Sequence, residues 1–160
     1  MIGVMSDSHD NVTQVKKAVS LFKDAGCELV LHAGDVVAPF AARELAALGC
    51  PVNAVFGNCD GEKQGLETVL EKIGGIKDAP LIFSHAGRQL ILVHYHFSVA
   101  TYAASGRYDI VIFGHTHKPV VQREGKTLLL NPGEAGGWLT GKSTVALLNP
   151  EKLEAEIIEL

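Results

Sequence analysis

Five short apolar segments of this chain are each followed at once by side chains that can bind a metal ion. The segments are residues 2–5, 29–31, 52–56, 89–93 and 110–113. Their length and their content of Val, Ile and Leu are typical of buried β-strands. Ligands of open α/β sheets bind beyond the carboxyl ends of the strands. The sequence therefore predicts that donors from five strand ends gather at one edge.

Helical patterns separate the strands of the first half. One helix is expected to begin at a cap of Asp10 or Asn11 and to end at Gly26. A second is expected over residues 38–48, and a third carries an apolar face over 66–73 until the glycines at 74 and 75 end it. Such strand–helix alternation predicts parallel strands with helices covering the sheet.

The second half is richer in strands. Residues 81–84 and 89–93 are expected to form a hairpin, and 97–105 a short helix. Four further segments are interpreted as one β-meander: residues 120–123, 127–130, 143–148 and 153–158. Two packed sheets with helices outside would accommodate all of these elements, and at 160 residues one domain spanning 1–160 is expected.

Composition excludes several classes of protein. The net charge is −4 and there is no basic run, which argues against a nucleic-acid clamp. Three cysteines without a CxxC pair argue against a disulfide framework or a structural zinc site and favour a reducing, cytoplasmic setting. A carboxylate at Asp7 comes too early for a signal peptide, and no apolar run approaches the length of a bilayer span.

The donors that follow the five strands are oxygen and nitrogen ligands without a thiolate. They are Asp7, His9, Asp35, Asn58, His94, His115 and His117. Seven donors are too many for one ordinary metal ion and suit two ions that share a carboxylate. In Asp7-x-His9 and His115-x-His117, side chains two apart on an extended segment would point the same way. Glycines 34, 57 and 114 would let the backbone turn sharply beside them.

The donor types also narrow the metal and the substrate. Imidazole, carboxylate and amide ligands together suit Mn²⁺, with Ni²⁺, Fe or Zn²⁺ as alternatives. Two divalent cations carry four positive charges, against the two negative charges of Asp7 and Asp35. The site would stay net positive and so favour a small phosphate ester as substrate. Two metal ions roughly 3.5–4 Å apart can activate water and stabilise the leaving oxygen.

In this order the motifs resemble the calcineurin-like metallophosphoesterase superfamily, and with Asn131–Pro132–Gly133 its small prokaryotic phosphodiesterases, the YfcE and MJ0936-like group. The resemblance implies a four-layer αββα sandwich of two mixed sheets, the metallo-dependent phosphatase fold. It also implies a phosphodiesterase in which a metal-bridging hydroxide attacks phosphorus in line. The first metal would be held by Asp7, His9, Asp35 and His117, and the second by Asp35, Asn58, His94 and His115, with Asn58 also counted among the catalytic residues.

The chain departs from the family pattern at two positions. Cys59 stands where many relatives have a histidine that helps to protonate the leaving group, and a thiol is a poor acid near neutrality. Asp60 and His96 are the remaining candidates for this role. Tyr95 stands where the family commonly has glycine, and its ring could narrow the pocket or stack on an aromatic leaving group.

Other interpretations remain open at this point. Each motif alone could be a helix cap, a turn or a polar loop, and only their conjunction indicates a metal site. His32 could orient a ligand or be a satisfied core residue. The eukaryotic retromer subunit VPS29 resembles the family but serves as a scaffold and lacks several ligands; here all seven are present. The physiological substrate and whether the chain forms homo-oligomers are not determined.

Overall fold

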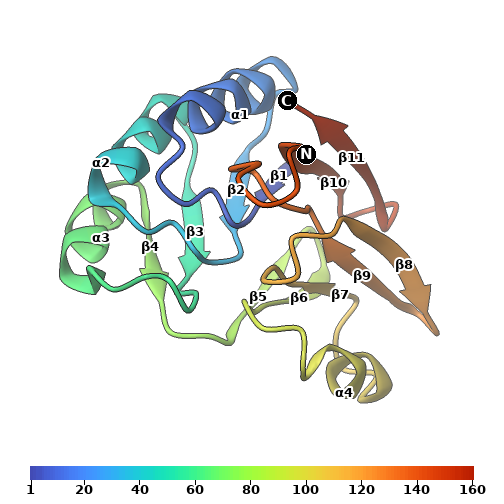
Figure 1. The fold of residues 1–160 in the computed structure, drawn as a ribbon. Helices are drawn as coiled ribbons and strands as arrows, with labels where there is room; N and C mark the ends of the chain where they lie inside the picture. Colours follow the sequence, from blue (N-terminus) through green and yellow to red (C-terminus); the bar gives the residue numbers. More distant parts are fainter.

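A computed structural model describes all residues 1–160 and contains two mixed β-sheets that pack face to face (Figure 1). The first sheet has six strands in the order β11-β10-β1-β2-β3-β4, and the second has five in the order β5-β6-β7-β9-β8. No helix combines the length and the apolar character that a bilayer span requires.

The first sheet is built mostly from strand–helix units. Its strands are β1 (Ile2–Met5), β2 (Leu29–His32), β3 (Val52–Val55), β4 (Gly74–Lys77), β10 (Thr144–Asn149) and β11 (Glu154–Glu159). β1 to β4 are parallel, and β10 and β11 extend the sheet in antiparallel pairing. The helices between them are α1 (Val12–Asp24), α2 (Pro39–Ala42) and α3 (Lys63–Leu70). All three cover the outer face of this sheet.

The second sheet carries the hairpin expected from the sequence. Its strands are β5 (Leu81–His85), β6 (Arg88–Leu92), β7 (Ile110–Ile112), β8 (Val120–Glu124) and β9 (Thr127–Asn131). β6, β7 and β9 run parallel, and β5 and β8 pair antiparallel at the two edges. The short helix α4 (Val99–Ala104) covers the outer face.

Three hydrophobic clusters separate four layers. Side chains alternate between the two faces of each central strand, so that Leu90 and Leu92 enter the cluster between the sheets while Ile91 enters the cluster under α4. In the same way Val30 packs under the helices of the first sheet, whereas its neighbours in β2 face the second sheet. The αββα sandwich predicted from the sequence is therefore confirmed, with both faces of the central strands buried.

Local sequence explains the first helix and its position. Asn11 caps α1, because its side-chain oxygen accepts a hydrogen bond from the backbone N–H of Gln14 at 3.3 Å. Gly3 lets this helix approach β1, since a Cβ there would lie 2.7 Å from the ring of Phe22. The cap places the start of α1 directly after the donors that follow β1.

Two elements expected from the sequence differ in the structure. The helix predicted over 38–48 is a short α-helix followed by a 3₁₀-helix, Arg43–Leu48, up to a left-handed Gly49. The glycines at 74 and 75 do not merely end α3: they open the edge strand β4, where a Cβ on Gly74 would collide with the carbonyl oxygen of Val52. Because glycine is a poor strand former, the residue propensities did not indicate this strand.

The predicted β-meander is wrong in its pairing. β8 and β9 form one hairpin and β10 and β11 another, but the two hairpins lie in different sheets. The connection after β9 crosses from the second sheet to the first. Hydrophobic alternation identifies strands but does not say which sheet receives them, because both sheets bury a face in the same core.

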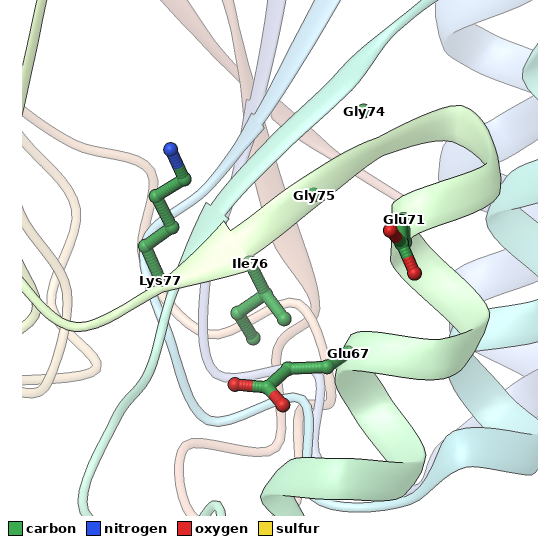
Figure 2. Close-up of a pocket in the computed structure, with 6 residues that line it drawn as sticks. All are labelled: Glu67, Glu71, Gly74, Gly75, Ile76 and Lys77. Atoms are coloured by element: carbon green, nitrogen blue, oxygen red, sulfur yellow. The ribbon is translucent and has the colours of Figure 1, made fainter.

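Beside β4 lies a surface hollow lined by Glu67, Glu71, Gly74, Gly75, Ile76 and Lys77 (Figure 2). Its two carboxylates are borne by α3 and the short 3₁₀-helix that follows it. No histidine or cysteine lines this hollow, and its carboxylates belong to none of the groups of side chains that could hold a metal ion. The side chains that could hold a metal ion lie elsewhere in the chain.

Candidate metal centre

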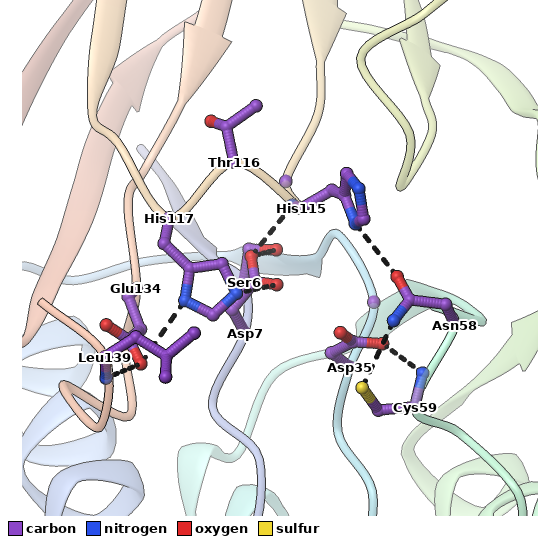
Figure 3. Close-up of polar contacts among 12 residues, drawn as sticks. Ser6, Asp7, Asp35, Asn58, Cys59, His115, Thr116, His117, Glu134 and Leu139 are labelled. Atoms are coloured by element: carbon purple, nitrogen blue, oxygen red, sulfur yellow. Dashed lines mark hydrogen bonds and ion pairs between the residues drawn. The ribbon is translucent and has the colours of Figure 1, made fainter.

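The ends of strands from both sheets meet at one edge of the sandwich. Asp7 and His9 follow β1, and Asp35 follows β2. The remaining predicted donors, Asn58, His94, His115 and His117, follow β3, β6 and β7. Figure 3 shows His117 beside Asp7 and His115 beside Asn58. The convergence predicted from the sequence is present.

The backbone at the donors is left-handed rather than extended. The φ angles are 51° at Asp7, 48° at His9, 58° at Asp35, 69° at His115 and 59° at His117. The expectation that extended segments would point these side chains the same way is therefore wrong. Their direction is set by left-handed backbone instead. Non-glycine residues adopt this region at a cost and do so mainly at functional sites. Backbone bonds hold the strained loops: the N–H of Asp7 donates to Gly34 O at 3.0 Å and that of His9 to Asp35 O at 2.9 Å.

The glycines beside the donors have two different roles. Only Gly34 has a positive φ, 96°, as a sharp turn requires. Gly57 and Gly114 are needed for space: a Cβ on Gly57 would collide with Asp35, and one on Gly114 would collide with the hydroxyl of Ser6. Close approach of the backbone to a polar side chain therefore explains two of the three glycines.

Asp7, His9 and His117 form the first group of potential ligands, with one donor atom of each within 4.8 Å of the others. Asp7 is fully buried, and burial raises its pKa despite the hydrogen bond that Ser6 Oγ donates to Oδ2 at 2.6 Å. Asp7 Oδ1 has no hydrogen-bond partner and lies 3.4 Å from His117 Nε2. A buried carboxylate oxygen without a donor is the position that a cation would satisfy.

His94, Asn58 and His115 form the second group. His94 Nδ1 lies 2.8 Å from the carbonyl oxygen of Ala33, to which a neutral imidazole donates its proton. The Nε2 lone pair then faces Asn58 Oδ1 at 2.9 Å and Asp35 Oδ2 at 3.6 Å, which are both acceptors. Burial and the neighbouring His94 lower the pKa of His115, which keeps its imidazole neutral as a ligand must be.

Asp35 lies between the two groups. Its carboxylate is within 4.8 Å of donor atoms of Asp7 and His94 in one set, and of His9 and Cys59 in another. A cation would satisfy the unpartnered Oδ1 of Asp7, and it would also bind the acceptors of His94 and Asn58 that face each other. The donor set therefore fits divalent metal ions. Asp7, His9 and Asp35 each belong to two of these groups of potential ligands.

Asp60 organises the loops instead of facing the donors. Its carboxylate accepts backbone N–H bonds from Asp35 at 3.0 Å, Val37 at 2.6 Å and Gly57 at 2.7 Å. It is 4% exposed and so ties the end of β2 to the end of β3. This arrangement favours a positioning role over the proton-donor role considered from the sequence, because both oxygens are already occupied as acceptors.

Sequence reasoning missed Glu134. Glu134 Oε1 lies 3.3 Å from His117 Nδ1 (Figure 3). The carboxylate also accepts N–H bonds from Leu139 and Thr140, both at 2.9 Å. Although burial acts to raise the pKa of Glu134, these donors hold it below its usual value. A signal was present, since Glu134 closely follows strand β9 as the other donors follow theirs.

His32 is a buried core residue beside the centre. Its Nε2 is 2.8 Å from Ser8 Oγ, and its Nδ1 accepts the N–H of Gly34 at 3.2 Å. Burial lowers its pKa to about 4. It supports the loops that carry Asp7 and Asp35 rather than facing a ligand position.

The two departures from the family pattern lie on the open side of the centre. Cys59 is exposed and its thiol accepts from Asn58 Nδ2 at 3.2 Å. Partial burial and the Asp35 carboxylate raise its pKa to about 11. Tyr95 packs edge-on against His115 with ring centroids 4.8 Å apart, and His96 stacks on His115 at 5.7 Å.

Comparison with known proteins places this fold and site in a family. Residues 1–153 match the calcineurin-like phosphoesterase superfamily domain. The chain is 39% identical to phosphodiesterase MJ0936 of Methanocaldococcus jannaschii over 99% of this chain and 98% of that protein. It is 27% identical to phosphodiesterase YfcE of Escherichia coli over 80% of this chain and 75% of that protein.

Solved structures agree. One described as a novel archaeal phosphodiesterase superposes with a TM-score of 0.94 at 36% identity, with 99% of each chain covered. Wild-type Vps29 of Entamoeba histolytica, solved in complex with Zn²⁺, superposes with a TM-score of 0.72 at 20% identity over 99% of this chain and 98% of that one. The second likeness concerns the fold alone.

The chain belongs to the calcineurin-like phosphoesterase superfamily. The resemblance inferred from the motifs is thereby confirmed, and so is the expectation of a metal-dependent phosphoester hydrolase at the level of the family.

Replacing Glu134 by Gln should weaken metal binding. The neutral amide stabilises an N–H at His117 Nδ1, 3.3 Å away, less well than the carboxylate, and mutation of such a partner typically lowers metal affinity by ~10–100-fold. Titration calorimetry with Mn²⁺ measures the effect, and Glu124→Gln on the exposed end of β8 is the matched control. Equal affinities for the two variants would contradict the role of Glu134.

His32 should make the fold sensitive to mild acid. Its folded pKa of about 4 lies below that of an unfolded histidine, so the unfolded state takes up the proton first as pH falls and stability is lost below about pH 6.5. Urea unfolding at pH 7 and pH 5 should differ by about 2 kcal/mol from this group. His32→Gln should lack that part of the difference; an unchanged pH dependence in the variant would argue against it.

Proposed function

We propose that this protein is a phosphodiesterase that uses two divalent metal ions held by Asp7, His9, Asp35, Asn58, His94, His115 and His117. The observation that carries the proposal is the pair of unsatisfied positions: the unpartnered Asp7 Oδ1 and the facing acceptors of His94 and Asn58. Each is a position that a bound cation would satisfy. The names of the relatives at 39% and 27% identity support the diester as the substrate class.

The residues themselves would set up the reaction by charge and position. When bound, the metal ions would supply positive charge to the phosphoryl oxygens and activate water for in-line attack at phosphorus. Asp7 and Asp35 are the only formal negative charges among the seven donors, so a phosphate ester would still be attracted. The mixed imidazole and carboxylate donors are compatible with Mn²⁺, which we propose as the ion.

His96 is the proposed proton donor for the leaving oxygen. As the bond between phosphorus and that oxygen breaks, the imidazolium would give its proton to the departing alkoxide. His96 is exposed and stacks on the ligand His115 with an interplanar angle of 15°. Asp60 is engaged by three backbone donors, and Cys59 has a raised pKa. His96 is thus the better placed of the candidates.

A scaffold function like that of VPS29 is the alternative. It would require no metal, whereas the complete set of seven donors, five of them with left-handed backbone, favours catalysis. Turnover distinguishes the two functions directly.

Metal removal should abolish hydrolysis of bis(p-nitrophenyl) phosphate, and Mn²⁺ should restore it. Asp35→Asn should lower kcat/KM by ~10³-fold, in keeping with the several kcal/mol of stabilisation that bound metal ions supply. Asp24→Asn on the exposed end of α1 is the control and should retain activity. Full turnover by protein stripped of metal, confirmed by elemental analysis, would refute the proposal.

His96→Asn should slow esters with alkyl leaving groups more than those with p-nitrophenyl. A p-nitrophenolate departs without a proton, whereas an alkoxide needs one, and general acid catalysis is typically worth ~10²–10⁴-fold. Rates for methyl and p-nitrophenyl diesters should be compared in the parent and the variant. A uniform loss over both leaving groups would show that His96 is not the donor.

A further inference from the structure

Two exposed aromatic side chains stack on each other at the rim of the metal centre. Tyr95 and Phe97 stack with ring centroids 5.6 Å apart and an interplanar angle of 20°. Tyr95 is 45% and Phe97 is 73% exposed. Large aromatic rings left open to solvent beside a site commonly mark a surface that a ligand covers. We call Tyr95 and Phe97 the aromatic platform.

The platform adjoins the metal ligands directly. His115 touches both rings, with centroid distances of 4.8 Å to Tyr95 and 6.1 Å to Phe97. The ring of Tyr95 also packs edge-on against His94 at 5.2 Å. A group lying on the platform would therefore be a close neighbour of a phosphate at the metal centre.

Tyr95 and the ligand His94 also line a small surface hollow. Its volume is about 150 Å³. Its apolar walls include Ala79 and Pro80, and its polar groups include the hydroxyl-bearing Ser98 and Tyr102. This mixture suits a flat heterocycle with polar edges better than an alkyl chain, which would gain nothing from the hydroxyls.

The segment that carries the platform has no basic side chain. No Lys or Arg occurs from residue 89 to residue 106. A polynucleotide would need cationic side chains along its phosphates, because these contacts supply most of its affinity. A single nucleotide needs only the metal centre for its phosphate and an aromatic face for its base.

We infer that the substrate is a nucleotide-type phosphodiester whose base lies on Tyr95 and Phe97 while its phosphate lies at the metal centre. The inference rests on the proposed function and specifies its substrate class. Tyr95, at the position where glycine is common in the family, thus becomes a specificity-determining residue. Stacking makes the contact selective for flat rings and tolerant of which base is bound.

The test compares two ligands that differ only in the base. Binding of adenosine 5′-monophosphate and of ribose 5-phosphate to the Mn²⁺-loaded protein is measured by titration calorimetry. We expect the nucleotide to bind ~5–100-fold more tightly, the range expected for one stacked base. The double variant Tyr95→Leu and Phe97→Leu, which keeps apolar bulk but removes the rings, should bind both ligands equally. Val121→Ala, an exposed apolar residue on the far edge strand β8, should keep the preference.

The outcomes separate this inference from the proposed function. Equal binding of the two ligands by a parent protein that hydrolyses bis(p-nitrophenyl) phosphate would overturn the platform and leave the phosphodiesterase standing. A preference that persists in the double variant would also overturn it. Failure of metal-dependent hydrolysis with every diester would instead remove the proposed function on which the inference rests.

Discussion

The rest of the site depends on two carboxylates that are buried where the sheets meet. Asp7 and Asp35 are 0% and 2% exposed. Taking a carboxylate out of water is costly unless it is paired, hydrogen-bonded or bound to a metal. Here the compensation is incomplete, because Asp7 Oδ1 has no partner and the pKa of Asp7 is raised by burial. The fold thus buries negative charge that a bound cation would stabilise.

The surrounding structure keeps these groups in place at a local cost. Left-handed backbone at five donors opposes the preference of ordinary residues. Asp60 offsets part of that cost by accepting hydrogen bonds from three backbone N–H groups of two loops. Glu134 lies beside His117 and accepts hydrogen bonds from the backbone at 139–140. Such prior ordering is what a catalytic metal site needs, because its ligands must be held before the reaction begins.

The two sides of the centre differ in character. The inner side is buried and polar, and Ser6, Asp60 and Glu134 form hydrogen bonds there. The outer side presents the exposed rings of Tyr95, His96 and Phe97 around His115. The inner side thus suits the binding of ions, and the outer side suits recognition of the organic part of an ester.

The sequence by itself determined every strand except β4, the sandwich class, and which polar side chains follow the strand ends. Apolar runs that end in Asp, Asn or His carry this information locally, because the polar residues sit where a parallel strand must deliver them. The tertiary structure decided what depends on distant partners. It assigned the last two hairpins to different sheets, made an edge strand of glycines 74 and 75, and gave Asp60 its three backbone donors. It also brought Glu134 to His117 and left Tyr95 and Phe97 exposed side by side. Periodicity reports which face of a strand is apolar, but which loops meet at the edge is settled only when two sheets pack on a common core.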